Sequence, residues 1–187
     1  MIRYQIAVSG AAKGDSVKLA HGLARMVGVQ IVRQGHILLT GATSGLPYAA
    51  AQAAKATEKD QVTSIGVSPA ESRLSHVNKY RLPTDAYDVI LYTGFDYTGR
   101  DLLLVRMSDA MIMIGGRIGT LNELTVALED HRPVGVLLGS GGMTSEVEAV
   151  LKAAKRNRSG IIFGSDPTKL VADVVKMVEQ RYRKLGK

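Results

Sequence analysis

The sequence predicts a three-layer, doubly wound α/β fold: a parallel sheet of about six or seven strands with helices on both faces. Short apolar runs alternate along the chain with longer segments of helical periodicity, the pattern of repeated strand–helix–strand units. The apolar runs are nearly uninterrupted, as expected for strands that are covered on both faces. A length of 187 residues suits one domain spanning residues 1–187.

Seven short β-branched or apolar runs predict strands, at residues 4–9, 36–40, 62–67, 89–92, 110–114, 134–138 and 160–163. Helical spacing predicts six helices, at residues 16 to about 33, 46 to about 59, 99–108, 120–131, 144–156 and 167 to about 184. Asp15 is a candidate N-cap of the first helix, and Asp166 followed by Pro167 is an N-cap with proline at the first helical position.

The longest irregular stretch is residues 68–88, SPAESRLSHVNKYRLPTDAYD. Loops of this length in compact domains often carry function, so Arg73 and His76 could cover part of a ligand site. The favoured interpretation is a solvated surface excursion.

Composition narrows the function classes. No apolar run is long enough to cross a membrane, and Arg3 and Tyr4 interrupt the opening run, so we expect a soluble cytoplasmic protein without a leader peptide. Cysteine is absent, which excludes disulfides, thiolate nucleophiles and Cys-based zinc sites. The four histidines lack HExxH or another ligand spacing, so no metal site is expected.

The excess of positive over negative charge lies at the end of the chain. From residue 151 onward there are 10 Lys/Arg against 3 Asp/Glu, so the net charge of +7 comes from this segment. A patch for phosphate or nucleic acid is one explanation. The favoured one is the solvated face of terminal helices, because valines and leucines recur at helical spacing between the cations.

Glycine-rich loops follow three predicted strands, at residues 9–14, 40–45 and 115–120. The carboxyl ends of parallel strands share one edge of the sheet, where ligands bind and helix N-termini favour anions. Each loop alone could be a tight structural turn, but three at one edge favour a phosphate site. The first loop is not a Walker A loop, because no lysine follows its second glycine, and it lacks the GxGxxG pattern of nicotinamide sites.

The segment IMIGGRIGTLNEL, which follows Asp109, Ala110 and Met111, resembles the signature of the LOG family, whose motif is PGGxGTxxE. LOG proteins are Rossmann-like, cytokinin-activating phosphoribohydrolases that were once misannotated as lysine decarboxylases. In this chain Gly115 replaces the proline of the motif and Arg117 its second glycine. The residues that fall on the motif are Gly116, Gly119, Thr120 and Glu123.

The resemblance extends over residues 6–138. TGATSGLPYAAAQAA is similar to the phosphate loop of the family with one residue fewer, and IAVSGAAKGD is similar to its opening strand and loop. The catalytic arginine of the family lies nine residues before the Asp of the strand, which corresponds to Arg100 here. The lysine that follows this arginine in the family is Asp101 in this chain.

The resemblance implies a nucleoside 5′-monophosphate N-glycosidase that releases a purine-type base and ribose 5-phosphate without a metal or redox cofactor. A fixed carboxylate, Glu123, would stabilise the oxocarbenium character that develops at C1′ and could orient the attacking water. Arg100 would bind phosphate or ribose hydroxyls and hold Glu123 ionised. The expected phosphate- or nucleotide-binding residues are Gly10, Gly41, Thr43, Ser44, Gly45, Gly115, Gly116, Arg117, Gly119 and Thr120.

Three alternatives stay open. Glu123 could simply complement the dipole of its helix. Arg117 could clamp a phosphate, or fill the pocket and prevent catalysis, which would favour a non-catalytic nucleotide or cofactor carrier similar to molybdenum-cofactor carriers. The basic C-terminus could bind nucleic acid, a function that ranks below the hydrolase and the carrier.

The resemblance also implies a homodimer or higher homo-oligomer. The predicted helices at residues 99–108 and 120–131 are expected at or near the interface.

Overall fold

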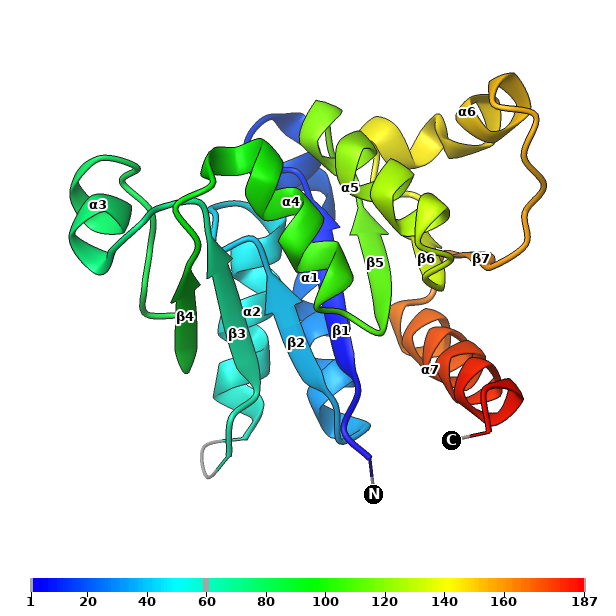
Figure 1. Ribbon diagram of the computed structural model, residues 1–187, viewed down its shortest axis with the longest axis horizontal. Coiled ribbons are helices and arrows are strands. Elements are labelled where there is room, and N and C mark those ends of the chain that lie inside the picture. The colour runs from blue at the N-terminus through cyan, green and yellow to red at the C-terminus, as the bar shows by residue number, and fades with distance from the viewer. Residues whose placement is uncertain (1, 59–60, 187) are drawn as a thin grey trace.

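A computed structural model describes residues 2–58 and 61–186 of the chain. Its centre is a seven-stranded, fully parallel sheet with the strand order β4-β3-β2-β1-β5-β6-β7 (Figure 1). The chain builds outward from β1 to β4 and then returns to place β5 beside β1. The strands are β1 Gln5–Gly10, β2 Ile37–Thr40, β3 Ser64–Ser68, β4 Val89–Tyr92, β5 Ala110–Ile114, β6 Val134–Leu137 and β7 Ile161–Gly164.

Helices cover both faces of this sheet, as the fold class predicted (Figure 1). Helices α1, α2 and α7 pack on one face, and α4, α5 and α6 on the other. The helices are α1 Asp15–Arg33, α2 Leu46–Thr57, α3 Arg73–Asn78, α4 Asp96–Arg106, α5 Ile118–Glu129, α6 Val147–Ala153 and α7 Pro167–Lys184, with the 3-10 helix η1 Gly142–Ser145 before α6.

The core follows the two-residue period of the strands. In β1 the side chains of Ile6 and Val8 belong to the apolar layer under α1, α2 and α7, whereas Ala7 belongs to the layer under α4, α5 and α6. The five residues of β5, AMIMI, are all buried. Uninterrupted apolar strands therefore reflect burial on both faces, as the sequence indicated.

Several predicted helix boundaries were wrong. The first helix begins at Asp15 itself, after a Gly14 cap without a side-chain hydrogen bond, so Asp15 is a first-turn acid and not the cap. The helix predicted at residues 99–108 begins three residues earlier, at Asp96. The helix predicted at residues 120–131 is α5, which ends at Glu129, and His131 has a left-handed φ of 51° that turns the chain away.

Other differences concern whole segments. The helix predicted at residues 144–156 is split into η1 and the short α6. The second helix ends at Thr57, and its expected end at Lys59 lies outside the described residues. The excursion at residues 68–88 contains the unpredicted helix α3, which Ser72 caps by accepting the backbone N–H of Ser75. By contrast, Asp166 caps α7 as predicted, at 2.7 and 3.1 Å from the N–H groups of Thr168 and Lys169.

No helix in the described part of the chain has both the length and the apolar composition of a membrane-spanning segment. Residues 2–58 and 61–186 also contain no group of three or more His, Asp or Glu side chains placed to hold one metal ion.

Candidate functional site

A cleft of about 300 Å³ lies beyond the carboxyl ends of the central strands. Its walls come from the loops after β1, β2 and β5 and from the first turns of α4 and α5. Strands β1 and β5 are the point where the strand order reverses, which is where open α/β sheets bind ligands. The three predicted glycine loops therefore do meet at one cleft.

Arg100 and Glu123 come together in this cleft. The Arg100 Nη1 atom of α4 donates to Glu123 Oε1 of α5 at 3.1 Å and lies 3.3 Å from Asp101 Oδ1. All three side chains are almost completely buried, with exposed fractions of 5–6%. Gly41 makes this possible, because a Cβ there would lie 1.9 Å from Nη1. The glycine after β2 thus gives space to an arginine, in addition to any approach to a ligand.

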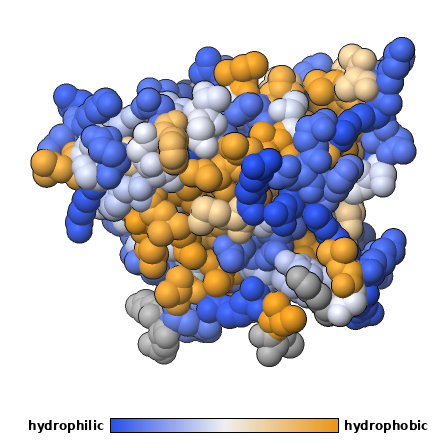
Figure 2. Space-filling view, in the orientation of Figure 1, coloured by the Kyte–Doolittle hydropathy of each residue, from blue (hydrophilic) through white to orange (hydrophobic). Residues whose placement is uncertain are grey.

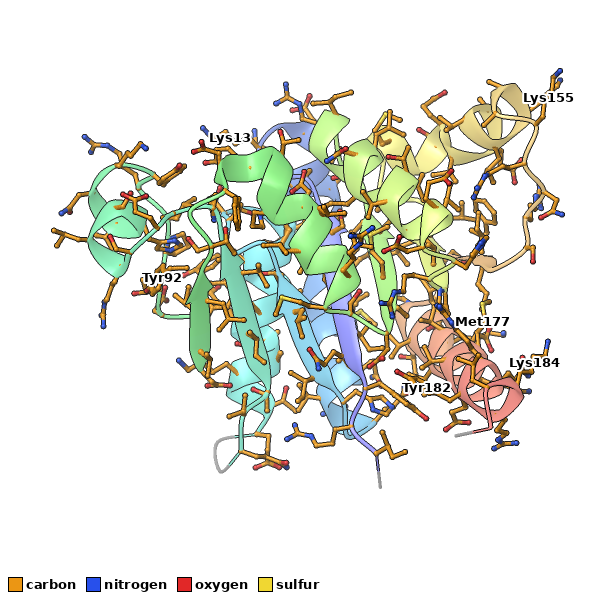
Figure 3. All side chains as sticks on the ribbon, viewed as in Figure 1. Lys13, Tyr92, Lys155, Met177, Tyr182 and Lys184 are labelled. Carbon is orange, nitrogen blue, oxygen red and sulfur yellow. The ribbon has the colours of Figure 1, made fainter. Side chains whose placement is uncertain are left out.

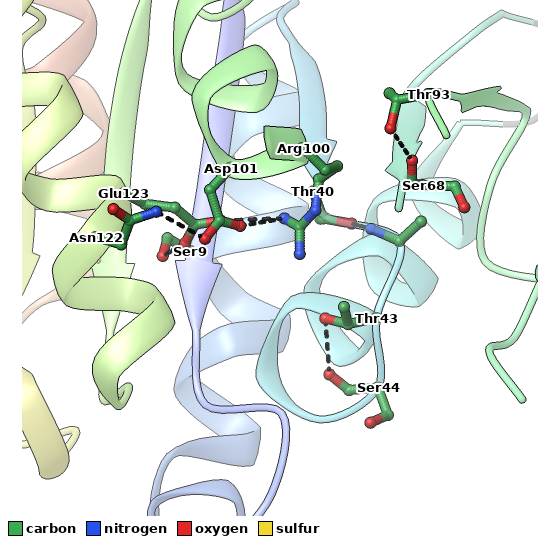
Figure 4. A network of polar contacts seen from close by, with 11 residues as sticks. Ser9, Thr40, Thr43, Ser44, Ser68, Thr93, Arg100, Asp101, Asn122 and Glu123 are labelled. Carbon is green, nitrogen blue, oxygen red and sulfur yellow. Dashed lines mark hydrogen bonds and ion pairs between the residues drawn. The ribbon is translucent and has the colours of Figure 1, made fainter. Parts of the chain in front are cut away.

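Two further side chains complete the network (Figure 4). Ser9, at the end of β1, donates its hydroxyl to Glu123 Oε2. Asn122 Nδ2 donates to Asp101 Oδ2 at 3.1 Å. Sequence reasoning assigned no role to either residue. The position of Ser9 at the carboxyl end of a central strand was a usable signal, whereas Asn122 carried none.

Burial raises the pKa of Glu123 to about 7, because the carboxylate loses its hydration. The Arg100 guanidinium opposes this rise in pKa, and the neighbouring Asp101 carboxylate adds to it. Arg100 therefore favours the ionised form of Glu123, in the direction expected from the sequence, but burial acts against it. With two carboxylates around one guanidinium, one negative charge would be left over in a buried site.

The Arg100 guanidinium has unused donors. Its Nε atom is buried without a hydrogen-bond partner among the described residues. In Figure 4 the two carboxylates lie on one side of the guanidinium, and one of its nitrogens points toward the loop that carries Thr43. A buried donor without a partner is costly. Because Arg100 also lines the cleft, its guanidinium is a candidate partner for an oxyanion ligand.

The predicted phosphate-binding residues divide into two groups. Those that line the cleft are Gly10, Gly41, Thr43, Arg117, Gly119 and Thr120. Those that do not line it are Ser44, Gly45, Gly115 and Gly116.

The second group joins loops to one another. The Gly115 N–H donates to Ser140 Oγ at 2.8 Å, and the Gly116 carbonyl accepts the Met143 N–H at 3.1 Å. Gly45 has a φ of 75°, and a Cβ there would lie 2.3 Å from the Ala11 carbonyl oxygen. Gly115 and Gly116 also have positive φ values, of 58° and 102°, so these glycines have structural reasons to be glycine.

Two exposed cations stand at the mouth of the cleft. Lys13 belongs to the loop after β1 and Arg117 caps α5, and both line the cleft. Figure 3 shows Lys13 at the end of the molecule where the strands terminate. Arg117 is exposed and forms no ion pair within residues 2–58 and 61–186, so it borders the cleft without filling it.

The basic C-terminal segment does not form one surface. Lys155 follows α6 and Lys184 ends α7, and these side chains point away from the fold in different places (Figure 3). Arg156 pairs with Glu129 at 2.9 Å, and Arg158 with Glu148 at 2.5 Å. This arrangement matches the favoured interpretation of solvated helix faces.

The sequence model of the SLOG cluster4 family matches residues 3–171. An uncharacterized protein of Archaeoglobus fulgidus is 30% identical over 133 residues, which are 71% of this chain and 79% of that protein. The Moco carrier protein of Chlamydomonas reinhardtii is similar in structure, with a TM-score of 0.75 at 26% identity, over 96% of this chain and 99% of that chain. The molybdenum cofactor binding protein of Rippkaea orientalis has a TM-score of 0.73 at 26% identity, over 95% and 98% of the two chains.

Proposed function

Because the chain belongs to the SLOG cluster4 family, a divergent branch of the LOG-like Rossmann superfamily, we propose that its cleft binds a nucleotide-like phosphate ester and hydrolyses the N-glycosidic bond. The products would be a purine-type base and ribose 5-phosphate. The observation that carries this proposal is the buried Glu123 carboxyl group, held by Arg100 and Ser9 at the bottom of a cleft bordered by glycine loops.

Glu123 is suited to stabilise the positive charge that develops on the ribose. As the C1′–N bond breaks, the base leaves with the bonding electrons and is protonated, and C1′ gains oxocarbenium character. A carboxylate fixed near C1′ lowers the energy of this state. Water then adds its hydroxyl group to C1′, and its remaining proton balances the one that the departing base takes up. Only ionised Glu123 supplies the charge, so hydrolysis should increase with pH as the carboxyl group, whose pKa is raised to about 7, loses its proton.

The phosphate has several candidate partners. The Arg100 guanidinium lines the cleft and can donate to an oxyanion. The hydroxyls of Thr43 and Thr120 and the Lys13 and Arg117 cations also border the cleft. The first turn of α5 adds backbone N–H groups and the positive end of its dipole.

A second candidate is a carrier that binds the same type of ligand without hydrolysing it. Two structural relatives that align with at least 95% of this chain are named for binding or carrying the molybdenum cofactor. In the site itself, Asp101 favours this candidate, because it helps to keep Glu123 protonated. The cations at the mouth suit an anionic cargo equally well.

Chromatography of free base separates the two candidates. Purified protein is incubated with a panel of nucleoside 5′-monophosphates that includes N6-substituted AMP. Wild type should release base from at least one nucleotide. Glu123→Gln and Arg100→Ala should lower the rate by about 100-fold or more, because each removes charge from the transition-state site.

Matched control variants on the same helices are Glu129→Gln and Arg106→Ala, whose side chains form exposed ion pairs away from the cleft. Both should keep the wild-type rate. If no nucleotide is cleaved but one binds in the micromolar range, the hydrolase proposal is wrong and the carrier remains.

A further inference from the structure

One aromatic side chain lines the cleft. Tyr97 is the second residue of α4 and is 47% exposed, and no other aromatic residue of the described chain borders this cleft. It precedes Arg100 by three positions and Asp101 by four, so the three side chains share one face of the helix. Tyr97 therefore lies about 5 Å, roughly one helical turn, from Arg100 along the axis and closer to the mouth.

Tyr97 is held in place by the excursion at residues 68–88. The Tyr80 ring meets the Tyr97 ring edge-on, with centroids 5.7 Å apart and an interplanar angle of 76°. The Tyr80 hydroxyl donates to Asp96, which raises the pKa of Tyr80 to about 12 and keeps the hydroxyl a donor. On the Tyr80 ring, Lys79 Nζ lies 5.0 Å from the centroid.

The excursion that supplies Tyr80 is itself anchored. The His76 ring, which is fully buried, bonds Ser68 Oγ at 2.8 Å through Nδ1 and the Pro83 carbonyl at 3.1 Å through Nε2. His76 itself is therefore not solvated, although most of the residues around it in the excursion are exposed, as the favoured interpretation expected. This anchoring fixes the segment that carries Tyr80, and through it the ring of Tyr97.

An apolar side chain from the neighbouring helix borders the same cleft. Ile118 is the first residue of α5 and is 79% exposed. Helices α4 and α5 lie next to each other on the same face of the sheet (Figure 1). Exposing a large apolar side chain and an aromatic ring at one cleft is unfavourable in water, unless a ligand covers them.

We propose that Tyr97 forms a stacking subsite for the planar heterocycle of the ligand, with Ile118 as a second apolar contact. This inference rests on the proposed function, since it requires a ligand whose phosphate-bearing half lies deeper in the cleft. A ring attached to a sugar carbon beside Glu123 would extend toward the mouth, where Tyr97 stands. Purine and pterin rings both have the flat π-face that such stacking needs.

Isothermal titration with AMP and with ribose 5-phosphate tests the subsite. All titrations use the Glu123→Gln background, so that no ligand is cleaved during the measurement. Adding Tyr97→Ala should weaken AMP binding by about tenfold, because stacking on an aromatic side chain contributes this much per base. Ribose 5-phosphate has no ring to stack, so its affinity should stay within about twofold.

Tyr97→Phe retains the ring and should retain AMP affinity. Phe95→Ala is the matched control, because Phe95 is 65% exposed at the start of the same helix but does not line the cleft. If Tyr97→Ala weakened the binding of AMP and of ribose 5-phosphate equally, or weakened neither, the proposal of a stacking subsite would be wrong. If neither ligand binds even with Tyr97 present, the proposed function and the subsite both fail. If the stacking result holds but wild type releases no base, only the hydrolase fails.

Discussion

Two carboxylates approach the same arginine nitrogen at the bottom of the cleft. Glu123 Oε1 and Asp101 Oδ1 lie 3.1 and 3.3 Å from Arg100 Nη1. Where the LOG pattern has a lysine, this chain has Asp101, so the charge of the cluster is lower by two units than with that lysine. A single guanidinium cannot neutralise both carboxylates, and the buried site favours a protonated Glu123. Burial is thus the main cause of the raised pKa of the proposed catalytic group, and the Asp101 carboxylate adds to it.

This protonation state should be visible in stability. The folded state raises the pKa of Glu123 from its usual value of 4.5 to about 7, whereas the unfolded chain does not. The stabilising contribution of the bound proton is therefore complete below about pH 4.5 and is lost as the pH rises through about 7. Glu123→Gln mimics the protonated form at all pH values. Between about pH 5 and pH 8, wild type should lose on the order of 1–3 kcal/mol of unfolding free energy relative to this variant.

Urea unfolding at several pH values measures this difference. Asp101→Asn removes the second carboxylate and should make the loss smaller, because it lowers the pKa of Glu123. In the control variant Glu129→Gln, which changes an exposed side chain, the unfolding free energy should depend on pH as it does in wild type. If the unfolding free energies of Glu123→Gln and wild type changed with pH in the same way, Glu123 would be ionised over the whole pH range of the experiment.

At the scale of elements, the closest helix pair is α1 with α2. A Cβ at Gly28 would lie 2.1 Å from the Ala50 carbonyl oxygen, so the two backbones nearly touch. Helix α2 allows this approach because its buried face consists mostly of alanine. The crossing places the N-terminus of α2, and with it the loop after β2, next to the loop after β1. Two walls of the cleft therefore depend on one glycine far from the site.

Gly28→Ala should destabilise the protein by about 1–3 kcal/mol, because the new methyl group meets backbone that can only move with the whole helix. Gly22→Ala is the control on the same helix, since a Cβ there meets nothing within 4 Å. It should stabilise by roughly 0.5–1 kcal/mol through helix propensity. Chemical denaturation compares the two variants, and equal effects would contradict this account of the helix crossing.

At the scale of the molecule, one side of the sheet is only partly covered. Beside α4, hydrophobic side chains gather over β2, β3 and β4 (Figure 2). Val89 and Leu91 of the edge strand β4 are 40% and 39% exposed, and Leu102 and Met107, on and just after α4, are each 37% exposed. An apolar surface of this kind is typical of a protein interface. The homodimer expected from the family resemblance could bury it.

We expect a mass of roughly twice 20.0 kDa in solution at micromolar concentration. Leu91→Glu should shift the protein to the monomer, because it would bury an unpaired charge in the interface. Met26→Glu is the control, since Met26 is 47% exposed on α1, which packs on the opposite face. Sedimentation equilibrium distinguishes these states. A wild-type mass of one chain, or dissociation by the control alone, would refute an interface at this surface.

Most of the strands and helices could be predicted from local patterns in the sequence. All seven strands and six of the helices were predicted, because apolar runs and helical spacing are imposed by burial on both faces of a sheet. Helix α3 was missed because its six residues are too short to show a period, and its anchor His76 bonds partners seven and eight positions away. Helix ends were wrong where left-handed residues such as His131 stop a helix without a glycine.

The sequence by itself determined the fold class and the edge of the sheet that carries the glycine loops, because these follow from periodicity and strand polarity. It pointed to the pair Arg100 and Glu123 through the resemblance to the LOG family. Only the tertiary structure decided which glycines line the cleft, that Ser9 bonds Glu123, and that Tyr80 supports Tyr97. It also decided that burial, together with Asp101, raises the pKa of Glu123. These properties depend on distances between residues far apart in the chain and on the removal of water from the site, which spacing along the sequence does not encode.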